Sequence, residues 1–374
     1  MNTDFFIEML DIESTSGRER GFADFLAKRM AAPGRRVETF EVPAMAQDCP
    51  EGCGIPVNLM VSWGEPKVVF CTHLDTVPPY IAPSVEVMED GDMKIKGRGS
   101  CDAKGQIFAM WEACLELERR GCTDFALLLL AGEETGSFGA KAFSGSAVAA
   151  DDKVVIVGEP TDNHMTSASK GTKSFEVTFK GEAFHSGYPQ YGRSAVEMFG
   201  DFMNALRSIV FPADEVLGDT TWNIGRLVSD NPQNILSDSL SCRVYFRTTF
   251  ESDQMVCNVM KNMAGPDARL RFGRGRAQDG SDMVAKEVAP WQKCMSVKAF
   301  GGDTPTVYQT LEGFPTKPVA FGSDAPQLKC FGRKILCGPG SILVAHRDEE
   351  HIMLSDLKAA AAGYVRMYTC LTGN

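Results

Sequence analysis

The chain has 374 residues, of which 44% are hydrophobic and 23% charged, and its formal net charge is −11. This length favours one large domain or two smaller ones, and the composition is typical of a soluble globular protein. Because the chain is acidic and carries no basic block, it is not expected to bind nucleic acid or an anionic membrane surface. Its longest apolar runs, such as residues 125–132, are too short to span a bilayer.

The N-terminal segment lacks a charged region followed by an apolar core, so no signal peptide is predicted. Twelve cysteines are scattered without framework spacing, mostly in hydrophobic segments, which predicts reduced thiols in a cytoplasmic protein. Cys49 and Cys53 form the one close pair, and no second pair completes a tetrahedral zinc site. We interpret that pair as part of a surface loop, and no role is predicted for residues 270–283.

The first third of the chain alternates between helical and strand patterns. Apolar residues at helical spacing predict helices at residues 4–10, 19–30 and 104–119. Continuous apolar runs predict buried strands at residues 67–71, 125–130 and 153–157. Buried strands separated by helices are typical of an α/β domain whose sheet is covered on both faces.

The pattern changes near residue 170. Apolar and polar residues alternate at 173–181 and 239–247, which is typical of strands that bury one face, and a helical stripe lies between them at 196–206. A Gly-rich segment follows, and the final elements are two buried strands and a helix, predicted at residues 317–321, 334–337 and 355–370. We therefore predict a discontinuous α/β catalytic domain from residues 1–169 and 281–374, with an α+β domain inserted at 170–280.

Chemistry-bearing side chains follow the predicted strands. They are His73, Asp75, Glu133, Glu134, Glu159 and His346, together with Asp102 directly before a helix. Open α/β sheets bind ligands beyond the carboxyl ends of their strands, so we expect these groups to converge. Several anions crowded together repel one another, and a pair of divalent cations would remove that repulsion. Imidazoles and carboxylates without a thiolate suit zinc, or less specifically cobalt or manganese.

Two metal ions about 3.5–4 Å apart can share a water and polarise a carbonyl oxygen. A free carboxylate must then take the proton of the water and deliver it to the leaving amine. The adjacent pair Glu133 and Glu134 suits this division, because neighbours in a loop point differently. The spacing alone does not say which of the two binds metal.

Seven motifs in one order resemble the M20 metallopeptidase family, in the branch of acetylornithine deacetylase and succinyl-diaminopimelate desuccinylase. They are 73-HLDTVP-78, 97-GRGSCDAKG-105, 132-GEETGSFGA-140, 158-GEPT-161, 183-AFHSGYPQYGRSA-195, 322-GSDA-325 and 338-GPG with 345-AHRDEE-350. The resemblance covers essentially the whole chain. It implies a catalytic domain with a mostly parallel sheet and an inserted ferredoxin-like domain that serves as lid and dimerisation domain.

The resemblance also implies a role for each residue of the cluster. The metal ligands it implies are His73 and Glu159 for one ion, Glu134 and His346 for the other, and Asp102 as the bridge. Glu133 matches the general base, and Asp75 matches the carboxylate that orients the first imidazole.

Three residues of the inserted domain also match family positions. His185 matches a histidine that steadies the developing oxyanion, often across a dimer. Asn234 and Arg247 match positions that hold the carboxylate of the substrate, for which the bidentate guanidinium of arginine is suited.

Simpler interpretations exist for single residues. His73 and His346 could be structural, His185 could cap the helix near residue 194, and Arg247 could lie on a solvated face. The cluster and the resemblance favour the site roles, whereas His164 and His351 lie outside the motifs and are interpreted as structural or surface residues. Gly132 and Ser237 depart from the pattern, at positions where relatives commonly have an acidic or hydroxyl residue and proline.

The predicted function is a cytoplasmic di-zinc amidohydrolase that cleaves an N-acyl amino acid, as an N-acetylornithine-like deacetylase would. An M20 aminopeptidase or dipeptidase and a succinyl-diaminopimelate desuccinylase-like enzyme are the alternatives. A metal-binding protein that has lost catalysis is disfavoured, because Glu133 is present. The predicted partners are a small N-acyl amino acid or dipeptide substrate and a second copy of the chain, bound through the lid.

Overall fold

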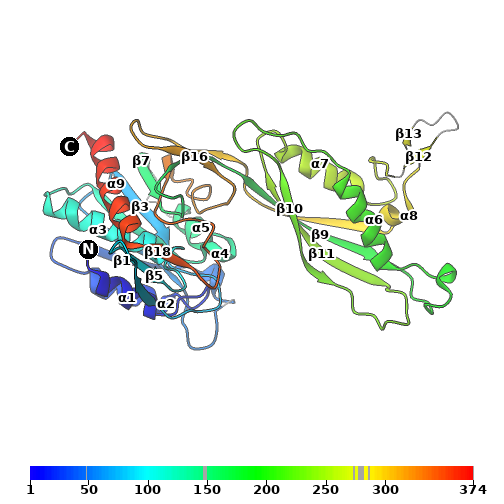
Figure 1. Cartoon of the computed structure of the whole chain (residues 1–374), viewed down its shortest axis with the longest axis horizontal. Coiled ribbons are helices and arrows are strands. Elements are labelled where there is room, and N and C mark those ends of the chain that lie inside the picture. Colours follow the sequence, from blue (N-terminus) through cyan, green and yellow to red (C-terminus); the bar gives the residue numbers. More distant parts are fainter. Residues whose placement is uncertain (48, 146–149, 273, 277–281, 285–286, 374) are drawn as a thin grey trace. The chain divides into compact units, whose positions relative to one another are not determined.

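The computed structural model describes residues 1–374 apart from 48, 146–149, 273, 277–281, 285–286 and 374 (Figure 1). The chain divides into two compact units. The first comprises Met1–Ser167, Val307–Val319 and Ser323–Asn374. The second comprises Ala168–Thr306 and Ala320–Gly322.

A six-stranded sheet forms the centre of the first unit, in the order β1-β2-β6-β3-β7-β17. These strands are β1 (Arg36–Glu41), β2 (Val57–Trp63), β3 (Val68–His73), β6 (Phe125–Leu130), β7 (Ala150–Val157) and β17 (Phe331–Leu336). β3 pairs in parallel with both β6 and β7, and β17 pairs in parallel with β7. Only the β1–β2 and β2–β6 pairs of this sheet are antiparallel, so the predicted, mostly parallel sheet is confirmed.

Helices cover this sheet on both faces, as Figure 1 shows for α3 and α9 on one side of β3 and β7 and α5 on the other. The helices of the first unit are α1 (Thr3–Asp11), α2 (Arg20–Met30), α3 (Lys104–Arg119), α4 (Glu133–Gly136), α5 (Phe138–Ser144) and α9 (Leu354–Thr372). The side chains of Phe70, Leu127 and Ile156 pack with α1, α2, α3 and α9 in one continuous core. On the opposite face, Phe143 of α5 stacks on Phe331 of β17.

Two small three-stranded sheets accompany the six-stranded sheet. β18 (His351–Met353) pairs with β5 (Met93–Lys96), which pairs with β4 (Ser84–Val87). β16 (Thr316–Val319) belongs to a three-stranded sheet with β8 (Met165–Ser169) and β15 (Thr306–Val307). The prediction of a buried strand at 317–321 was therefore wrong: three of the four β16 residues are not buried, and the strand lies outside the main sheet.

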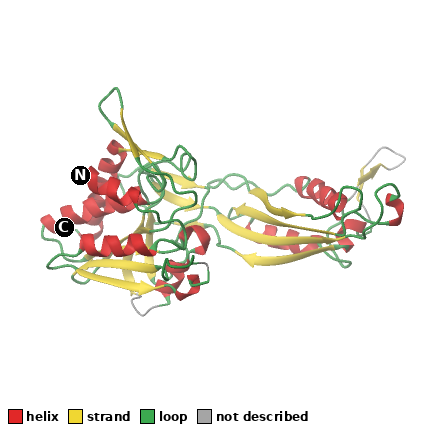
Figure 2. Cartoon of the chain, turned by 90° about the horizontal axis from the view of Figure 1, so that it is seen from below, coloured by secondary structure: helices red, strands yellow, loops and turns green. Residues whose placement is uncertain are grey.

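The second unit is a four-stranded antiparallel sheet in the order β10-β11-β9-β14. Its strands are β9 (Gly171–Lys180), β10 (Thr221–Val228), β11 (Ser239–Thr248) and β14 (Met295–Gly301). Its helices are α6 (Ala195–Arg207), α7 (Asp253–Met263) and α8 (Pro290–Lys293), and β12 (Arg274–Arg276) pairs with β13 (Asp282–Val284). The alternating Phe175, Val177 and Phe179 of β9 face the helices, which lie on one face of the sheet (Figure 2).

The second boundary of the inserted domain needs correction. The predicted limit between residues 280 and 281 falls outside the described residues, but β14, which was assigned to the catalytic domain, pairs with β9. The second unit therefore continues to Thr306. β14 is an edge strand whose partner lies more than a hundred residues earlier, and such long-range pairing leaves no local pattern in the sequence.

No helix of the described ranges is long and apolar enough to cross a membrane. Cys71, Cys114 and Cys337 are buried in the core of the first unit without a disulfide. Helices η1 (Pro43–Met45) and η2 (Pro189–Tyr191) are short 3₁₀ turns.

The core of the first unit makes a stability prediction. Leu127 of β6 is fully buried, so Leu127→Ala should lower the free energy of unfolding by about 3 kcal/mol, because it removes packed atoms and leaves a cavity. Urea unfolding followed by circular dichroism measures this change. Leu343→Ala, at a leucine that is 75% exposed, is the control and should change stability by less than about 0.5 kcal/mol. Equal effects in both variants would contradict the assignment of this core.

Candidate metal centre

The ends of three parallel strands bring the predicted site residues together in the first unit. β3 ends at His73, Glu133 follows β6, and Glu159 follows β7. Because β3 lies between β6 and β7 and runs parallel to both, these strand ends meet at one edge of the sheet. Asp102 reaches the same edge from the turn before α3, and His346 from the loop after β17.

Asp102 lies between the two imidazoles. Its Oδ1 is 2.9 Å from Nε2 of His73, and its Oδ2 is 3.2 Å from Nε2 of His346. His346 Nε2 is also 2.9 Å from Oε1 of Glu134. Each oxygen of the Asp102 carboxylate therefore faces a different imidazole, which is the arrangement that a bridging ligand requires.

Two groups of potential ligands share Asp102. His73, Asp102 and Glu159 form one group, and Asp102, Glu134 and His346 form the other; in each, the donor atoms lie within 4.8 Å of one another. These are the two ligand sets that the family resemblance implies. A third group joins His73 to Glu133 and Glu134, so the division of labour between the two glutamates stays a prediction.

Asp75 lies directly behind the cluster and is fully buried. Its carboxylate accepts hydrogen bonds from the backbone N–H groups of Glu133 (3.0 Å) and Glu134 (3.3 Å) and from the hydroxyl of Ser16 (2.7 Å). Nδ1 of His73 is 2.9 Å from the backbone carbonyl oxygen of Asp75, and 3.5 Å from its carboxylate. Asp75 thus orients the imidazole mainly through its backbone, and its carboxylate holds the turn that carries the two glutamates.

The contacts of Asp102 decide its charge. Burial acts to raise its pKa, but hydrogen bonds from His346 and His73 outweigh burial and hold the pKa below its ordinary value. Burial also opposes the charged form of His73, but its bonds to Asp102 and Asp75 raise the pKa well above its ordinary value. Hydrogen bonds to Asp102 and Glu134 raise the pKa of His346 to about 10.

The remaining carboxyls of the cluster behave in the opposite way. Burial, reinforced by neighbouring carboxylates, raises the pKa of Glu133 and of Glu159 well above the ordinary value, and that of Glu134 is raised for the same reason. Divalent cations would reverse this by favouring the ionised forms. The donor set of imidazole nitrogens and carboxylate oxygens fits such ions, and its lack of a thiolate matches zinc, cobalt or manganese.

Two buried acids beside the cluster were not assigned a role from the sequence. Burial raises the pKa of Asp324 to about 7, and burial with the nearby charge of Asp75 raises that of Glu19 to about 8. Asp324 lies in the motif 322-GSDA-325, which signalled it. Glu19 carries no such signal, because it is the first residue of an ordinary helical pattern, predicted at residues 19–30.

Gly132, which stands where relatives commonly have an acidic or hydroxyl residue, suits the local backbone. Gly132 has a φ of +67°, in the left-handed region that glycine adopts without strain. A Cβ atom at this position would lie 2.6 Å from the sulfur of Met45. A larger residue here would adopt a strained backbone conformation and would require the end of the Met45 side chain to move.

The three predicted residues of the inserted domain lie in the second unit. His185 is exposed, and its Nδ1 accepts a hydrogen bond from the backbone N–H of Gly187 at 3.0 Å. The neutral ring must then carry its proton on Nε2, where it can be donated. The segment of Asn234 lies beside that of His185, since the Asn234 carbonyl accepts from the N–H of Ser186. Arg247 lies on β11, opposite Thr172 of β9 and Thr221 of β10.

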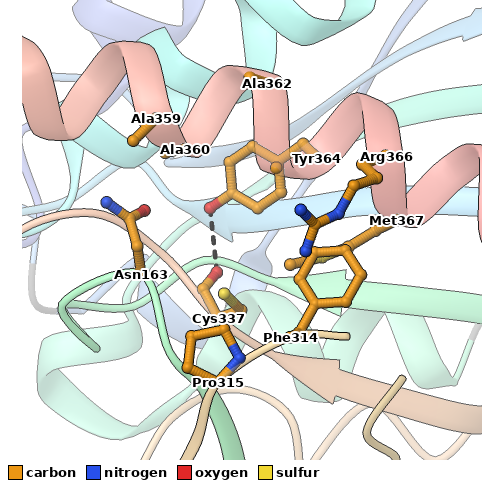
Figure 3. Close-up of a pocket in the computed structure, with 11 residues that line it drawn as sticks. Asn163, Phe314, Pro315, Cys337, Ala359, Ala360, Ala362, Tyr364, Arg366 and Met367 are labelled. Atoms are coloured by element: carbon orange, nitrogen blue, oxygen red, sulfur yellow. Dashed lines mark hydrogen bonds between the residues drawn. The ribbon is translucent and has the colours of Figure 1, made fainter. Parts of the chain in front are cut away.

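A cavity of about 250 Å³ lies elsewhere in the first unit, against α9 (Figure 3). Tyr364 donates to the carbonyl of Cys337 at its base, and the guanidinium of Arg366 lies 3.8 Å from the centre of the Phe314 ring. Its lining residues offer no carboxylate or imidazole, so this cavity is not the site of hydrolytic chemistry.

Comparisons with known proteins identify the family and several relatives of this chain. Residues 69–369 match the model of peptidase family M20/M25/M40. A probable carboxypeptidase of Aspergillus terreus is 32% identical, over 97% of this chain and 84% of that protein. A peptidase M20 domain-containing protein of Schizosaccharomyces pombe is also 32% identical, over 96% of this chain and 82% of its own length.

Solved structures share the fold. The structure of a tripeptidase from Staphylococcus aureus superposes with a TM-score of 0.75 at 19% identity, and the match covers 100% of this chain and 98% of the other. At that identity the likeness speaks to the fold alone. The predicted branch of acetylornithine deacetylase stays a prediction, since the relatives named above are a carboxypeptidase and an M20 peptidase.

The raised pKa of His346 predicts how the metal-free protein responds to pH. Folding favours the charged imidazole, so its contribution to stability is fully present below about pH 6.5 and is lost as the pH rises to about 10. The melting temperature of the chelator-treated protein should fall over this range. His346→Asn should flatten that fall. Buried acids such as Glu19, whose pKa is raised from 4.5 to about 8, lose their contribution as the pH rises between these two values, but they do so equally in both proteins. Identical pH profiles for both proteins would contradict the assigned hydrogen bonds.

Proposed function

This chain belongs to peptidase family M20/M25/M40, and on that premise we propose that it is a two-metal peptidase of the carboxypeptidase type, acting on short peptides. One observation carries the proposal: a single carboxylate, Asp102, faces His73 at 2.9 Å and His346 at 3.2 Å and joins two ligand groups. The relatives named probable carboxypeptidase support a peptide substrate over an N-acetylated amino acid.

The residues that would hold the two ions are His73 and Glu159 on one side of Asp102, and Glu134 and His346 on the other. Zinc suits these donors best, and cobalt or manganese would also fit them. When bound, such ions lower the pKa of water and polarise a carbonyl oxygen.

Glu133 then moves the proton. Its carboxyl is buried next to the ligands, and its pKa is raised in the absence of a counter-charge, so it can both accept and return a proton. Glu133 takes a proton from the attacking water while the water oxygen bonds to the peptide carbonyl carbon. As the C–N bond breaks, Glu133 gives this proton to the leaving nitrogen. The second proton of the water leaves the new carboxylic acid, so the products are a carboxylate and a protonated amine.

Three residues of the second unit are proposed to bind the substrate. His185 would donate from Nε2 to the developing oxyanion, and the bond from Gly187 to its Nδ1 supports this tautomer. Arg247 and Asn234 would hold the C-terminal carboxylate. The guanidinium of Arg247 lies 5.1 Å from the centre of the Tyr245 ring, and its planar fork suits a bidentate contact with a carboxylate.

Deacetylation of N-acetylornithine, or removal of a succinyl group from an acylated diamino acid, is the second candidate. The motifs shared with the acetylornithine deacetylase and succinyl-diaminopimelate desuccinylase branch favour it, and the chemistry is the same amide hydrolysis. A cytoplasmic location and a homodimer formed through the inserted domain are also part of this proposal; both rest on sequence patterns and family resemblance.

A substrate screen separates the candidates. With zinc or cobalt supplied, dipeptides and tripeptides with a free C-terminus should have kcat/KM at least about tenfold above N-acetylornithine and N-succinyl-diaminopimelate. Amidation of the peptide C-terminus should remove most of this activity, because Arg247 would lose the carboxylate that it is proposed to bind. A preference for N-acetylornithine would favour the second candidate. Hydrolysis of none of these compounds would contradict both.

Glu133→Gln tests the proton transfer. Glutamine keeps the size of the side chain but cannot accept the proton, so kcat should fall by about 10²–10⁴-fold while bound metal stays near the wild-type content. Initial rates and elemental analysis give the two readouts. Glu349→Gln, at an exposed glutamate near His346, is the control and should retain activity. Full turnover by Glu133→Gln would show that another group moves the proton.

His185→Ala tests the oxyanion contact. Removal of one donor should lower kcat by about 10²–10³-fold, with little change in KM or metal content, because the contact forms in the transition state. His164→Ala is the matched control, since His164 is a histidine whose Nδ1 contacts a backbone carbonyl. A change in KM alone would assign His185 to ground-state binding instead.

A further inference from the structure

A buried ion pair lies under the ligand loops of the first unit. Nη1 of Arg98 is 2.6 Å from Oε2 of Glu350, and the two side chains are 2% and 0% exposed. Burying two charges is costly unless further hydrogen bonds satisfy them. Neither residue belongs to the proposed ligands, the proton transfer or the substrate contacts. The partners of this pair therefore show what it holds in place.

Glu350 holds the backbone that carries Asp102. Its second oxygen, Oε1, accepts hydrogen bonds from the N–H groups of Cys101 and Asp102, both at 3.0 Å. The carboxylate thus accepts two backbone donors and one guanidinium donor. Any movement of Glu350 would change the position of Asp102, whose side chain faces both imidazoles.

Arg98 extends the same contact to two other loops. Its Nε donates to the carbonyl of Pro79, in the segment that follows His73, and its Nη1 donates to the carbonyl of Arg347, next to His346, both at 3.2 Å. The guanidinium therefore connects the segments that carry the two imidazoles.

The backbone fixes this pair at one end of a small sheet. His351 of β18 pairs with Lys96 of β5, and one step beyond, the N–H of Gly97 donates to the carbonyl of Glu350 at 3.1 Å. This register places Arg98 and Glu350 side by side at the start of the Asp102 loop and the end of the His346 loop. The three ligand loops, which carry His73, Asp102 and His346, thus all contact this buried ion pair, which we call their anchor.

We propose that Arg98 and Glu350 are positioning residues that set the separation of His73, Asp102 and His346. They thereby determine how tightly a cation is bound by the group of Asp102, Glu134 and His346, which is the second metal site. This inference rests on the proposed two-metal function. The ligand group of Glu134 and His346 is the more sensitive of the two, because His346 lies on a loop and its side chain is 46% exposed. His73 ends a fully buried strand and depends less on the anchor.

Glu350→Gln is the most direct test. The glutamine oxygen can still accept from Cys101 and Asp102, but its NH₂ group would face the guanidinium of Arg98, donor against donor. Calorimetric titration of the metal-free protein with cobalt should show a first site near wild type and a second site weakened by about 10–100-fold. In the zinc-loaded protein kcat should fall while KM for the peptide changes little, because the reacting groups move and the substrate contacts do not.

A matched variant separates positioning from stability. Glu118 forms an ion pair with Arg35 at 2.5 Å and accepts from the indole of Trp63 at 2.8 Å, and none of the three belongs to the ligand loops. Glu118→Gln should lower the melting temperature without weakening either cobalt site. Arg98→Lys keeps the charge but loses the planar fork, and should weaken the second site in the same way as Glu350→Gln.

A second cobalt site weakened in Glu350→Gln but unchanged in Glu118→Gln supports the inference. If Glu350→Gln does not fold, the same comparison between Arg98→Lys and Glu118→Gln decides. Two wild-type cobalt sites in both folded anchor variants, or equal weakening in Glu118→Gln, would overturn the inference alone. A wild-type protein that binds fewer than two ions overturns the proposed function as well.

Discussion

The carboxylate of Asp102 faces two imidazoles, one at each oxygen, and two groups of potential metal ligands share it. The two imidazoles keep Asp102 ionised, yet the neighbouring Glu133 and Glu159 have raised pKa values because they are buried beside other acids. Such crowding is unfavourable without a compensating positive charge. The cost of assembling these groups is therefore itself an argument for divalent cations at this position.

The fold supplies the rigidity that this crowding demands. His73 ends a strand that is buried along its whole length, between two parallel neighbours. Asp75 then ties the end of that strand to the turn that carries Glu133 and Glu134. A ligand that ends a close-packed strand, such as His73, cannot move far to relieve this repulsion, so part of the geometry suited to two ions is held before any ion binds.

Much of this arrangement could be predicted from the sequence, for identifiable reasons. Residues 104–119 and 125–130 have the patterns of a buried helix and strand, and α3 and β6 have those bounds. The residues at the strand ends then converge because parallel strands end at one edge. The family match agrees with the hydrolase prediction, whereas the preference for N-acetylornithine is weakened by the carboxypeptidase relatives.

The misses also have physical reasons. β14 joins the second unit through long-range pairing that its own residues do not signal. β16 is a short, largely exposed strand, although the apolar run 319–321 that begins at its last residue suggests burial. Glu19 becomes part of the site only because the fold buries it near Asp75. Arg98 and Glu350 lie within quoted motifs, but their pairing requires two loops about 250 residues apart to meet. Tertiary contacts of this kind have no local pattern.

Anomalous diffraction from crystals of the zinc-loaded protein tests the central claim most directly. The account predicts two zinc peaks about 3.5–4 Å apart, with one carboxylate oxygen of Asp102 on each. One peak should lie beside His73 and the other beside His346. A single peak, or two peaks of which only one contacts Asp102, would contradict it.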